Sequence, residues 1–190
     1  AWPNKPVKIV VPYAPGGAVD AVTRKMVQKL TELTGQSFFV QNKAGATGTI
    51  GSAQVVHAPA DGYTLLANDT TYALMPHIFK KLAFDPANDL QPAAAFVFAP
   101  MAVVVKDDSK FNTLADLEGA GKAQANRVSY GTGGAGTTPH FASEALGIAT
   151  GANFLHVPYK GAGEATLGLL GGSIDFQIAS TPGVMGQVKG

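Results

Sequence analysis

The sequence predicts an α/β protein with two lobes, each containing a mostly parallel sheet flanked by helices. The order strand, glycine-rich loop, helix recurs in both halves of the chain, which is typical of parallel sheets. An irregular, proline-containing stretch over residues 85–100 separates the halves. Charged residues make up only 14% of the chain and glycines number 23, which suits tightly turned α/β units. We therefore expect lobe 1 at residues 1–102 and lobe 2 at residues 103–190.

The first half contains a predicted βαβαβ unit. Residues 7–11 are mostly β-branched and end at Pro12, which cannot continue a ladder of hydrogen bonds. Apolar residues then recur with helical spacing from Val19 to Leu33, and Gly35 ends this helix. A strand over residues 37–41, a loop over 42–48, a helix over 49–57 and a strand over 63–67 follow.

The second half repeats this order after a strand at residues 101–105 that links the halves. The expected elements are a strand at 128–130, a loop at 131–138, a helix at 139–150, a strand at 153–157, a loop at 158–163, a helix at 164–170 and a strand at 174–178. Two βαβαβ halves in one chain predict two facing lobes, each with loops at the carboxyl ends of its strands.

Glycine-rich loops before helices predict an anion site. The amides of a helix N-terminus lack intrahelical acceptors and carry partial positive charge. We expect ligand contact from Gly16 and Gly17 in the first loop and from the loop at residues 131–138, where Thr138 and Pro139 begin a well-capped helix. For the loop at residues 43–48 the simplest explanation is a turn that needs positive φ.

Residues 131–136, Gly-Thr-Gly-Gly-Ala-Gly, also match the dinucleotide fingerprint. An NAD-dependent oxidoreductase is therefore an alternative function. That fingerprint requires an acidic residue near the end of the next strand, and no Asp or Glu lies between Glu144 and Glu164. A scaffold without a small ligand is a third possibility.

Other chemistries have little support in the sequence. The chain has no cysteine, and its four histidines, His57, His77, His140 and His156, show no zinc spacing, so we expect no metal site. No nucleophile elbow is present, and a near match to a phosphate-binding loop fails at Ala123. The formal net charge is +1 without a basic run, which excludes nucleic acid as an expected partner.

Three further side chains lie near the expected site. Asp20 and Arg24 are one helical turn apart, and we expect a surface ion pair there. His140 lies in the first turn of its helix, where contact with the ligand and a structural role are both open. Asp69 follows a strand and either caps a turn or accepts a hydrogen bond from the ligand.

Four groups of motifs resemble the Bug/TctC family, the extracytoplasmic solute receptors of tripartite tricarboxylate transporters. The matching segments are residues 10–17 with Asp20 and Arg24, residues 58–65, residues 129–136 with Pro139 and His140, and residues 156–161 with residues 171–175. The resemblance covers the whole chain. It implies a periplasmic-binding-protein-like receptor that closes on its ligand and is not an enzyme.

The resemblance also implies a site, partners and a location. By the resemblance, the expected ligand-binding residues are Tyr13, Ala14, Gly16, Gly17, Gly134, Thr137 and Thr138. The reading of the sequence itself adds Asp69, Thr70, Gly133, His140 and Tyr159. The expected ligand is a small carboxylic acid, the expected protein partners are membrane transporter subunits, and no cofactor is expected. The N-terminal residues 1–6 read like the trimmed end of an exported protein, which agrees with a periplasmic location.

Two departures from the family pattern refine these expectations. Members usually carry a serine-rich segment where Asp69 stands, which favours an amino, hydroxy or aromatic acid over a plain dicarboxylate. The family also continues beyond the segment that matches residues 184–190, so both lobes are expected to lack their last elements in this chain.

Overall fold

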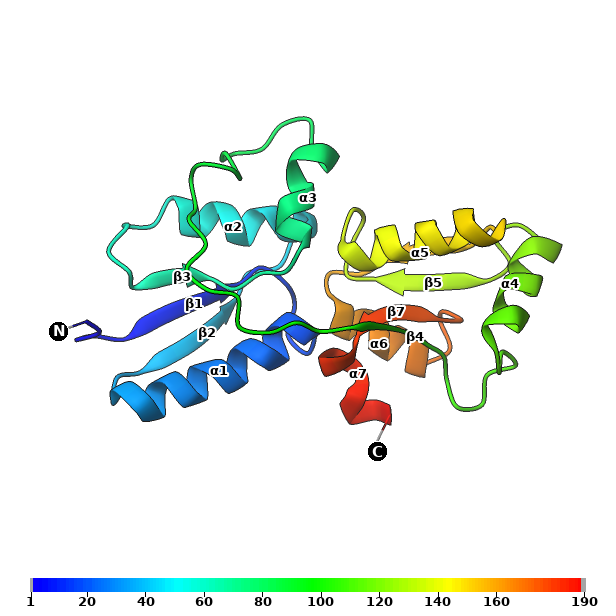
Figure 1. Ribbon diagram of the computed structural model, residues 1–190, viewed down its shortest axis with the longest axis horizontal. Coiled ribbons are helices and arrows are strands. Elements are labelled where there is room, and N and C mark those ends of the chain that lie inside the picture. The colour runs from blue at the N-terminus through cyan, green and yellow to red at the C-terminus, as the bar shows by residue number, and fades with distance from the viewer. Residues whose placement is uncertain (1, 189–190) are drawn as a thin grey trace.

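Parallel pairing of three strands builds the first lobe in a computed structural model that describes residues 2–188. Strands β2 (Phe38–Asn42), β1 (Val7–Val11) and β3 (Thr64–Leu66) lie in that order. Helices α1 (Ala18–Thr34) and α2 (Thr49–Val56) connect them, and a short 3-10 turn, η1 (Ala46–Gly48), precedes α2. Because the right-handed crossovers from β1 to β2 and from β2 to β3 run in opposite directions across the sheet, α1 and α2 cover its opposite faces (Figure 1).

The core of this lobe forms around its central strand. Val7, Ile9 and Val11 of β1 are almost fully buried and pack with Val27 of α1 and Phe38 of β2. A strand covered by helices on both faces needs apolar residues throughout, which explains the continuous apolar run at this point of the sequence. Helix α3 (Thr71–Ile78) follows β3.

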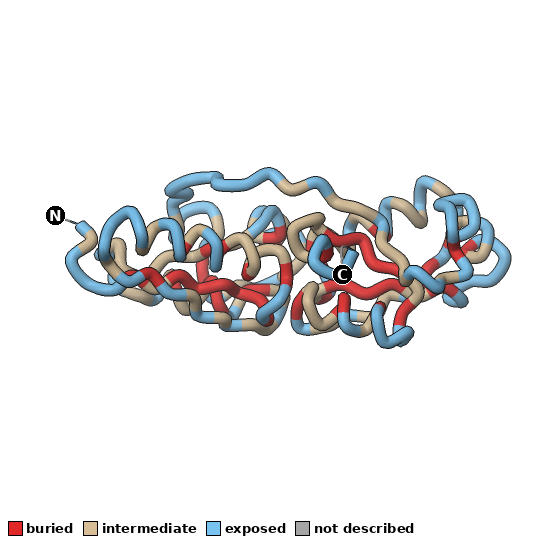
Figure 2. The backbone as a smooth tube through the Cα atoms, turned by 90° about the horizontal axis from the view of Figure 1, so that it is seen from below, coloured by how far each residue is buried: buried red, intermediate tan, exposed pale blue. Residues whose placement is uncertain are grey.

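Residues 79–100 join the lobes and contain turns but no helix or strand. Residues 91–98 are all exposed, and Figure 2 shows this segment as a pale trace along the outside of the molecule. The irregular stretch that the sequence predicts between the halves is confirmed.

The second lobe combines two ladders. Strand β4 (Met101–Val104) pairs antiparallel with β7 (Gln177–Ser180), and β5 (Ser129–Thr132) pairs parallel with β6 (Leu155–Pro158). A parallel bridge between Tyr130 and Phe176 joins the ladders and gives the order β4-β7-β5-β6. The helices are α4 (Leu114–Ala123), α5 (Thr138–Thr150), α6 (Ala162–Leu170) and α7 (Thr181–Val188).

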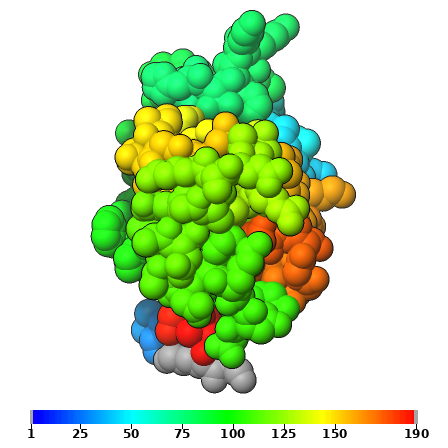
Figure 3. Space-filling view, turned by 90° about the vertical axis from the view of Figure 1, so that its right-hand side faces the viewer, coloured from blue at the N-terminus to red at the C-terminus, as the bar shows by residue number. Residues whose placement is uncertain are grey.

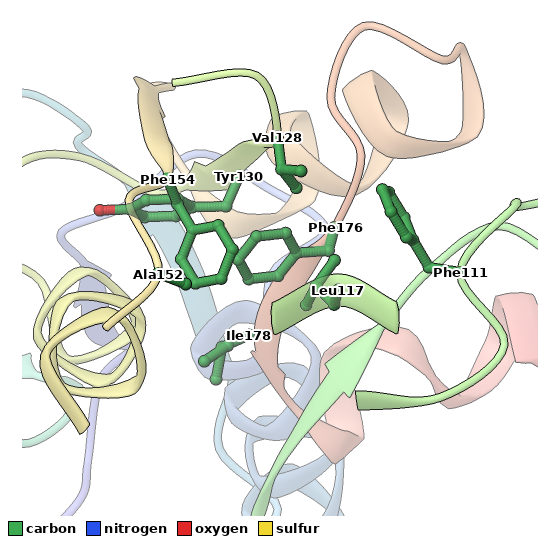
Figure 4. Packing of buried hydrophobic residues seen from close by; sticks show 8 residues of the cluster. All are labelled: Phe111, Leu117, Val128, Tyr130, Ala152, Phe154, Phe176 and Ile178. Atoms are coloured by element: carbon green, nitrogen blue, oxygen red, sulfur yellow. The ribbon is translucent and has the colours of Figure 1, made fainter. Parts of the chain in front are cut away.

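Aromatic side chains fill the core of the second lobe (Figure 4). Phe154 and Phe176 meet edge to face with ring centroids 5.1 Å apart, and the Tyr130 ring packs against Phe176 at 5.5 Å. The ring of Phe154 lies so close to α4 that a Cβ on Gly121 would be 2.6 Å from it. Gly121, in the segment that nearly matches a phosphate-binding loop, is therefore required by packing.

The two-lobed α/β fold is confirmed, and several local predictions are corrected. Helices α3, α4 and α7 were not predicted, because α3 contains Pro76 and α4 contains two glycines within ten residues. Gly131 and Thr132 belong to β5 rather than to the loop, since Gly131 N–H donates to the Phe176 carbonyl. The lobe boundary at residue 102 stays a prediction, and β4, which contains this residue, pairs entirely with β7.

A capping box starts α4, which covers the outer end of the second lobe (green in Figure 3). The Thr113 hydroxyl accepts the Asp116 N–H at 3.1 Å, and Asp116 accepts the Thr113 N–H at 2.9 Å. We expect Thr113→Ala to lower the free energy of unfolding by about 1 kcal/mol, since one N-terminal amide loses its acceptor. Urea denaturation measures this loss, Thr113→Ser is the matched control, and equal midpoints for the two variants would contradict the role of the cap.

Candidate interlobe binding site

The lobes meet through backbone-to-backbone contacts between glycine-containing loops. A Cβ on Gly163 would lie 2.8 Å from the Pro15 carbonyl oxygen, and one on Gly161 would lie 2.9 Å from Ala14 Cβ. Gly17 faces Ala162 in the same seam, where an added Cβ would be 3.4 Å from the alanine Cβ. The loop after β1 and the loop before α6 can approach this closely only because Gly161 and Gly163 have no side chains.

Threonine hydroxyls form hydrogen bonds across the same seam. Thr47 Oγ1 donates to the Ala135 carbonyl at 2.7 Å, and the hydroxyls of Thr70 and Thr138 lie 2.7 Å apart. Thr71 Oγ1 accepts the backbone N–H of Thr138 at 3.2 Å. The second glycine loop of lobe 1, which contains Thr47, thus contributes to the contact between the lobes.

A cavity of about 50 Å³ lies at this seam, where the N-termini of α1, α5, α6 and α7 converge (Figure 1). It is lined by Tyr13, Ala14, Gly17, Ala18, Val19, Asp20, Asp69, Gly133, Thr137, Pro139, Ala162, Thr166, Ala179, Ser180, Gly183 and Val184. No lysine or arginine is among these residues. Helix N-termini, whose first-turn amides lack intrahelical acceptors, are therefore the source of partial positive charge at this cavity.

A second cavity of about 220 Å³ adjoins the first and shares five of its lining residues. The shared residues are Ala18, Val19, Asp69, Pro139 and Ser180. Beyond them the second cavity reaches the apolar side chains of Val22 and Met101, the linking segment at residues 96–99, and the hydroxyls of Thr70 and Thr138. Both cavities thus combine a few polar groups with a mostly apolar lining.

Asp20 fixes the shape of the first loop from beneath. Its carboxylate accepts the Gly16 N–H at 3.0 Å, the Arg24 Nε–H at 3.0 Å and an Asn42 Nδ2–H at 2.9 Å. Asn42 also donates to the Tyr13 carbonyl, which ties the loop to the end of β2. The predicted ion pair between Asp20 and Arg24 forms, but its predicted place on the surface is wrong for Asp20, because only 6% of that side chain is exposed.

The pKa of Asp20 reflects this network. Burial alone would raise the pKa of this carboxyl, but the hydrogen bonds from Arg24, Gly16 and Asn42 outweigh it and lower the pKa below its usual value. Asp20 is therefore ionised and fully engaged by its neighbours, which leaves it no hydrogen-bonding capacity to offer a ligand.

Asp69 differs from Asp20 because it is exposed where the two cavities join. It accepts the Thr71 N–H at 2.9 Å, which confirms the predicted role as a turn cap, and the Tyr13 hydroxyl at 3.1 Å. Burial and the neighbouring Asp69 carboxylate raise the pKa of Tyr13 well above its usual value, so its phenol stays protonated. The remaining acceptor positions of Asp69 face the cavities without a basic partner among the lining residues.

Most of the residues predicted for the site meet at this seam. Tyr13, Ala14, Gly17, Asp69, Gly133 and Thr137 line the first cavity, and Thr70 and Thr138 line the second. Four others lie behind the lining: Gly16, Gly134, His140 and Tyr159. Tyr159 packs beneath the loop, where a Cβ on Gly131 or Gly168 would touch its ring.

Sequence reasoning missed the contribution of α6 and α7. Ala162 and Thr166 of α6 and Ser180, Gly183 and Val184 around the start of α7 all line the first cavity. A usable signal was present, because Ser180-Thr181-Pro182 repeats the pattern of Thr137-Thr138-Pro139 at the start of α5.

The glycines of the fingerprint at residues 131–136 have packing roles. A Cβ on Gly133 would lie 2.9 Å from the Ala162 nitrogen, and one on Gly136 would lie 2.7 Å from Ile78. These close approaches explain the glycines without a pyrophosphate, and β6 ends at Pro158 without the acidic residue that a ribose requires. The oxidoreductase alternative is unsupported.

Residues 2–188 contain neither a cluster of metal-ligating side chains nor a membrane-spanning helix. Within this range no group of three or more His, Cys, Asp or Glu residues is placed to hold a metal ion. No helix in the same range combines the length and the apolar composition needed to cross a bilayer.

Two α/β lobes with helix N-termini around an interlobe cavity define the class of periplasmic binding proteins. The chain belongs to the tripartite tricarboxylate transporter family receptor (TctC) family, whose model matches residues 22–190. The members and structural neighbours of this family are transport-associated receptors rather than enzymes, which confirms the prediction from the motifs.

Relatives and solved structures agree with this assignment. The chain is 36% identical to a UPF0065 protein of Pseudomonas sp. strain P51 over 95% of its length, and it spans 54% of that protein. It matches periplasmic binding protein BugD with 32% identity and a TM-score of 0.93, covering 99% of this chain and 63% of that one. The Rhodopseudomonas palustris protein Rpa4515, solved with adipate, gives 29% identity and a TM-score of 0.94, with 100% and 64% covered.

Proposed function

We propose that this chain is the main part of a periplasmic receptor that captures a small organic carboxylate between its lobes and delivers it to a membrane transporter. One observation carries the proposal: four helix N-termini converge on a cavity lined by no basic side chain. Such amides bind a carboxylate by direct hydrogen bonds and by the helix dipole. The adipate bound to Rpa4515 is a ligand of this chemical class.

The position of Asp69 supports a narrower ligand class. Its carboxylate lies at the join of the cavities and would repel a second carboxylate at close range. A ligand with an ammonium or hydroxyl group next to its carboxylate would instead donate to Asp69. The apolar surface around Val22 and Met101 would hold the remainder of such a ligand. These features favour an amino, hydroxy or aromatic acid over a plain dicarboxylate.

Membership of the family supports a membrane transporter as the partner and the periplasm as the location. A receptor of a tripartite tricarboxylate transporter has membrane subunits as partners, and BugD is a periplasmic binding protein. Closure of the lobes on a ligand would complete a surface that the membrane subunits distinguish from the open form.

Thermal unfolding with a panel of small acids tests the proposal. We expect a malate, an amino acid or an aromatic acid at 100 times its Kd to stabilise the protein by about 2.7 kcal/mol, whereas NAD(H) has no effect. Asp69→Asn should weaken binding of an amino acid and strengthen binding of adipate, because it removes the carboxylate that both ligands face. Unchanged melting temperatures across the whole panel, with no co-purified ligand in native mass spectrometry, would contradict the proposal.

A further inference from the structure

Two imidazole rings stack behind the loop that contributes Gly133 and Thr137 to the cavity. His140 of α5 and His156 of β6 have ring centroids 4.0 Å apart and an interplanar angle of 18°. The Tyr130 ring also stacks with His156, with ring centroids 5.0 Å apart. This stack lies outside the lining of both cavities, so a role in ligand contact does not explain it.

Each imidazole is hydrogen-bonded to the loop. The backbone N–H of Gly136 donates to His140 Nδ1 at 2.9 Å. His156 Nε2 lies 2.7 Å from Thr132 Oγ1, and this hydroxyl accepts the N–H of Gly134 at 3.2 Å. Gly134 and Gly136 both have positive φ, of 135° and 81°, in a turn that other residues rarely adopt. The stacked rings therefore hold the two glycines that give the loop its shape.

The contact with Gly136 requires a neutral His140. Because Nδ1 accepts a hydrogen bond, it carries no proton, and the ring proton is on Nε2, which lies 3.8 Å from a Glu144 carboxylate oxygen. Protonation of His140 would place a second N–H at Nδ1, directly facing the Gly136 N–H. The loop would then lose this hydrogen bond, and two donors would face each other.

Titratable and charged groups face the stack from several elements. Burial, with a smaller contribution from His140, lowers the pKa of His156 to about 4. From β5, Tyr130 contributes a neutral phenol that donates to Glu144, since burial and this hydrogen bond raise its pKa. Helix α3 packs over Gly136 through Ile78 and also carries the exposed His77. Glu144 is thus the acidic partner that would stabilise a charged His140.

We propose that His140 and His156 are positioning residues for the ligand loop, and that ligand affinity depends on His140 being neutral. This inference rests on the proposed carboxylate site, because the amides that the loop presents are those proposed to bind the ligand. Acidification would then loosen the loop and favour release of the ligand.

An isosteric substitution separates positioning from a general structural role. In His140→Asn the side-chain oxygen occupies the place of Nδ1, accepts the Gly136 N–H and does not titrate. We expect the wild type to lose about tenfold in affinity for malate between about pH 8 and about pH 6, where carboxylates stay ionised. His140→Asn should bind with nearly constant affinity over this range, and His140→Ala should bind about tenfold more weakly at both ends, which corresponds to one lost hydrogen bond.

A second measurement does not depend on the ligand. In the protein without malate, the NMR signal of the Gly136 amide should shift as pH falls in the wild type and stay constant in His140→Asn. Equal pH dependence of malate affinity in the two proteins, or a Gly136 signal that does not titrate in the wild type, would overturn the inference. Failure of malate and the whole acid panel to bind at about pH 8 would contradict the proposed function instead, and the Gly136 titration would still decide the role of His140.

Discussion

Gly163→Ala is expected to weaken carboxylate binding by about tenfold to hundredfold while the lobes stay folded. The added methyl group would lie 2.8 Å from the Pro15 carbonyl oxygen and 2.9 Å from the Gly16 carbonyl carbon, and both atoms belong to the backbone of the opposite lobe. Neither can turn aside as a flexible side chain would, so the lobes must separate. Overpacking of this kind costs about 1–3 kcal/mol, and it destabilises only the closed state, in which the two loops touch.

Two measurements on Gly163→Ala distinguish a closure defect from misfolding. Isothermal titration should show the lower affinity, and small-angle scattering should show a larger radius of gyration in the presence of ligand than for the wild type. Gly119→Ala in α4 is the matched control, because a Cβ there meets no atom within 4 Å. It should raise stability by about 0.5–1 kcal/mol and leave affinity unchanged. If Gly163→Ala bound the ligand with wild-type affinity, the predicted role of this close contact in lobe closure would be contradicted.

The strands of the first lobe were predictable because their signal is local. β1 is covered on both faces, so its residues form an almost unbroken apolar run, and Pro12 marks its end.

The strand β7 was predicted about three residues too early, over residues 174–178. Ile174 and Phe176 are buried, but Asp175 accepts the Ser129 N–H and holds this stretch in a turn that leads into the strand. A contact between residues 46 positions apart leaves no pattern in the local sequence.

The candidate site was predictable only where the local sequence of a loop indicates ligand binding. Glycines before a helix indicate an anion site in either lobe, and this signal led to Gly17 and Thr137. Asp20 was misplaced on the surface because the spacing to Arg24 is also that of an exposed helical pair. Its burial depends on Asn42, which comes from another strand and enters through tertiary packing.

Asp20→Asn is expected to lower the free energy of unfolding by about 2–3 kcal/mol and to weaken ligand binding. The amide can accept only part of the three hydrogen bonds, and its NH2 group would face the Nε–H of Arg24 or the Asn42 amide. Because Arg24 is half exposed, water partly compensates it, and the cost stays below that of a fully buried pair. The Gly16 amide then loses its anchor, and the loop that lines the cavity becomes less ordered.

The pH dependence of stability supplies an independent signature of the Asp20 network. Since the pKa of Asp20 is lower in the folded protein than in the unfolded chain, its contribution is complete above the ordinary carboxyl value. This contribution is lost as pH falls through the lowered pKa, so the gap between wild type and Asp20→Asn should narrow in acid. Urea titrations at neutral pH and near pH 3 measure this difference in the free energy of unfolding, and a difference of constant size would contradict the role of the Asp20 network.

Glu32→Gln, which removes the exposed pair with Lys29, is the control and should change stability by less than about 0.5 kcal/mol. The contrast isolates burial and convergent hydrogen bonds, rather than ion pairing itself, as the reason that Asp20 holds the ligand loop in place.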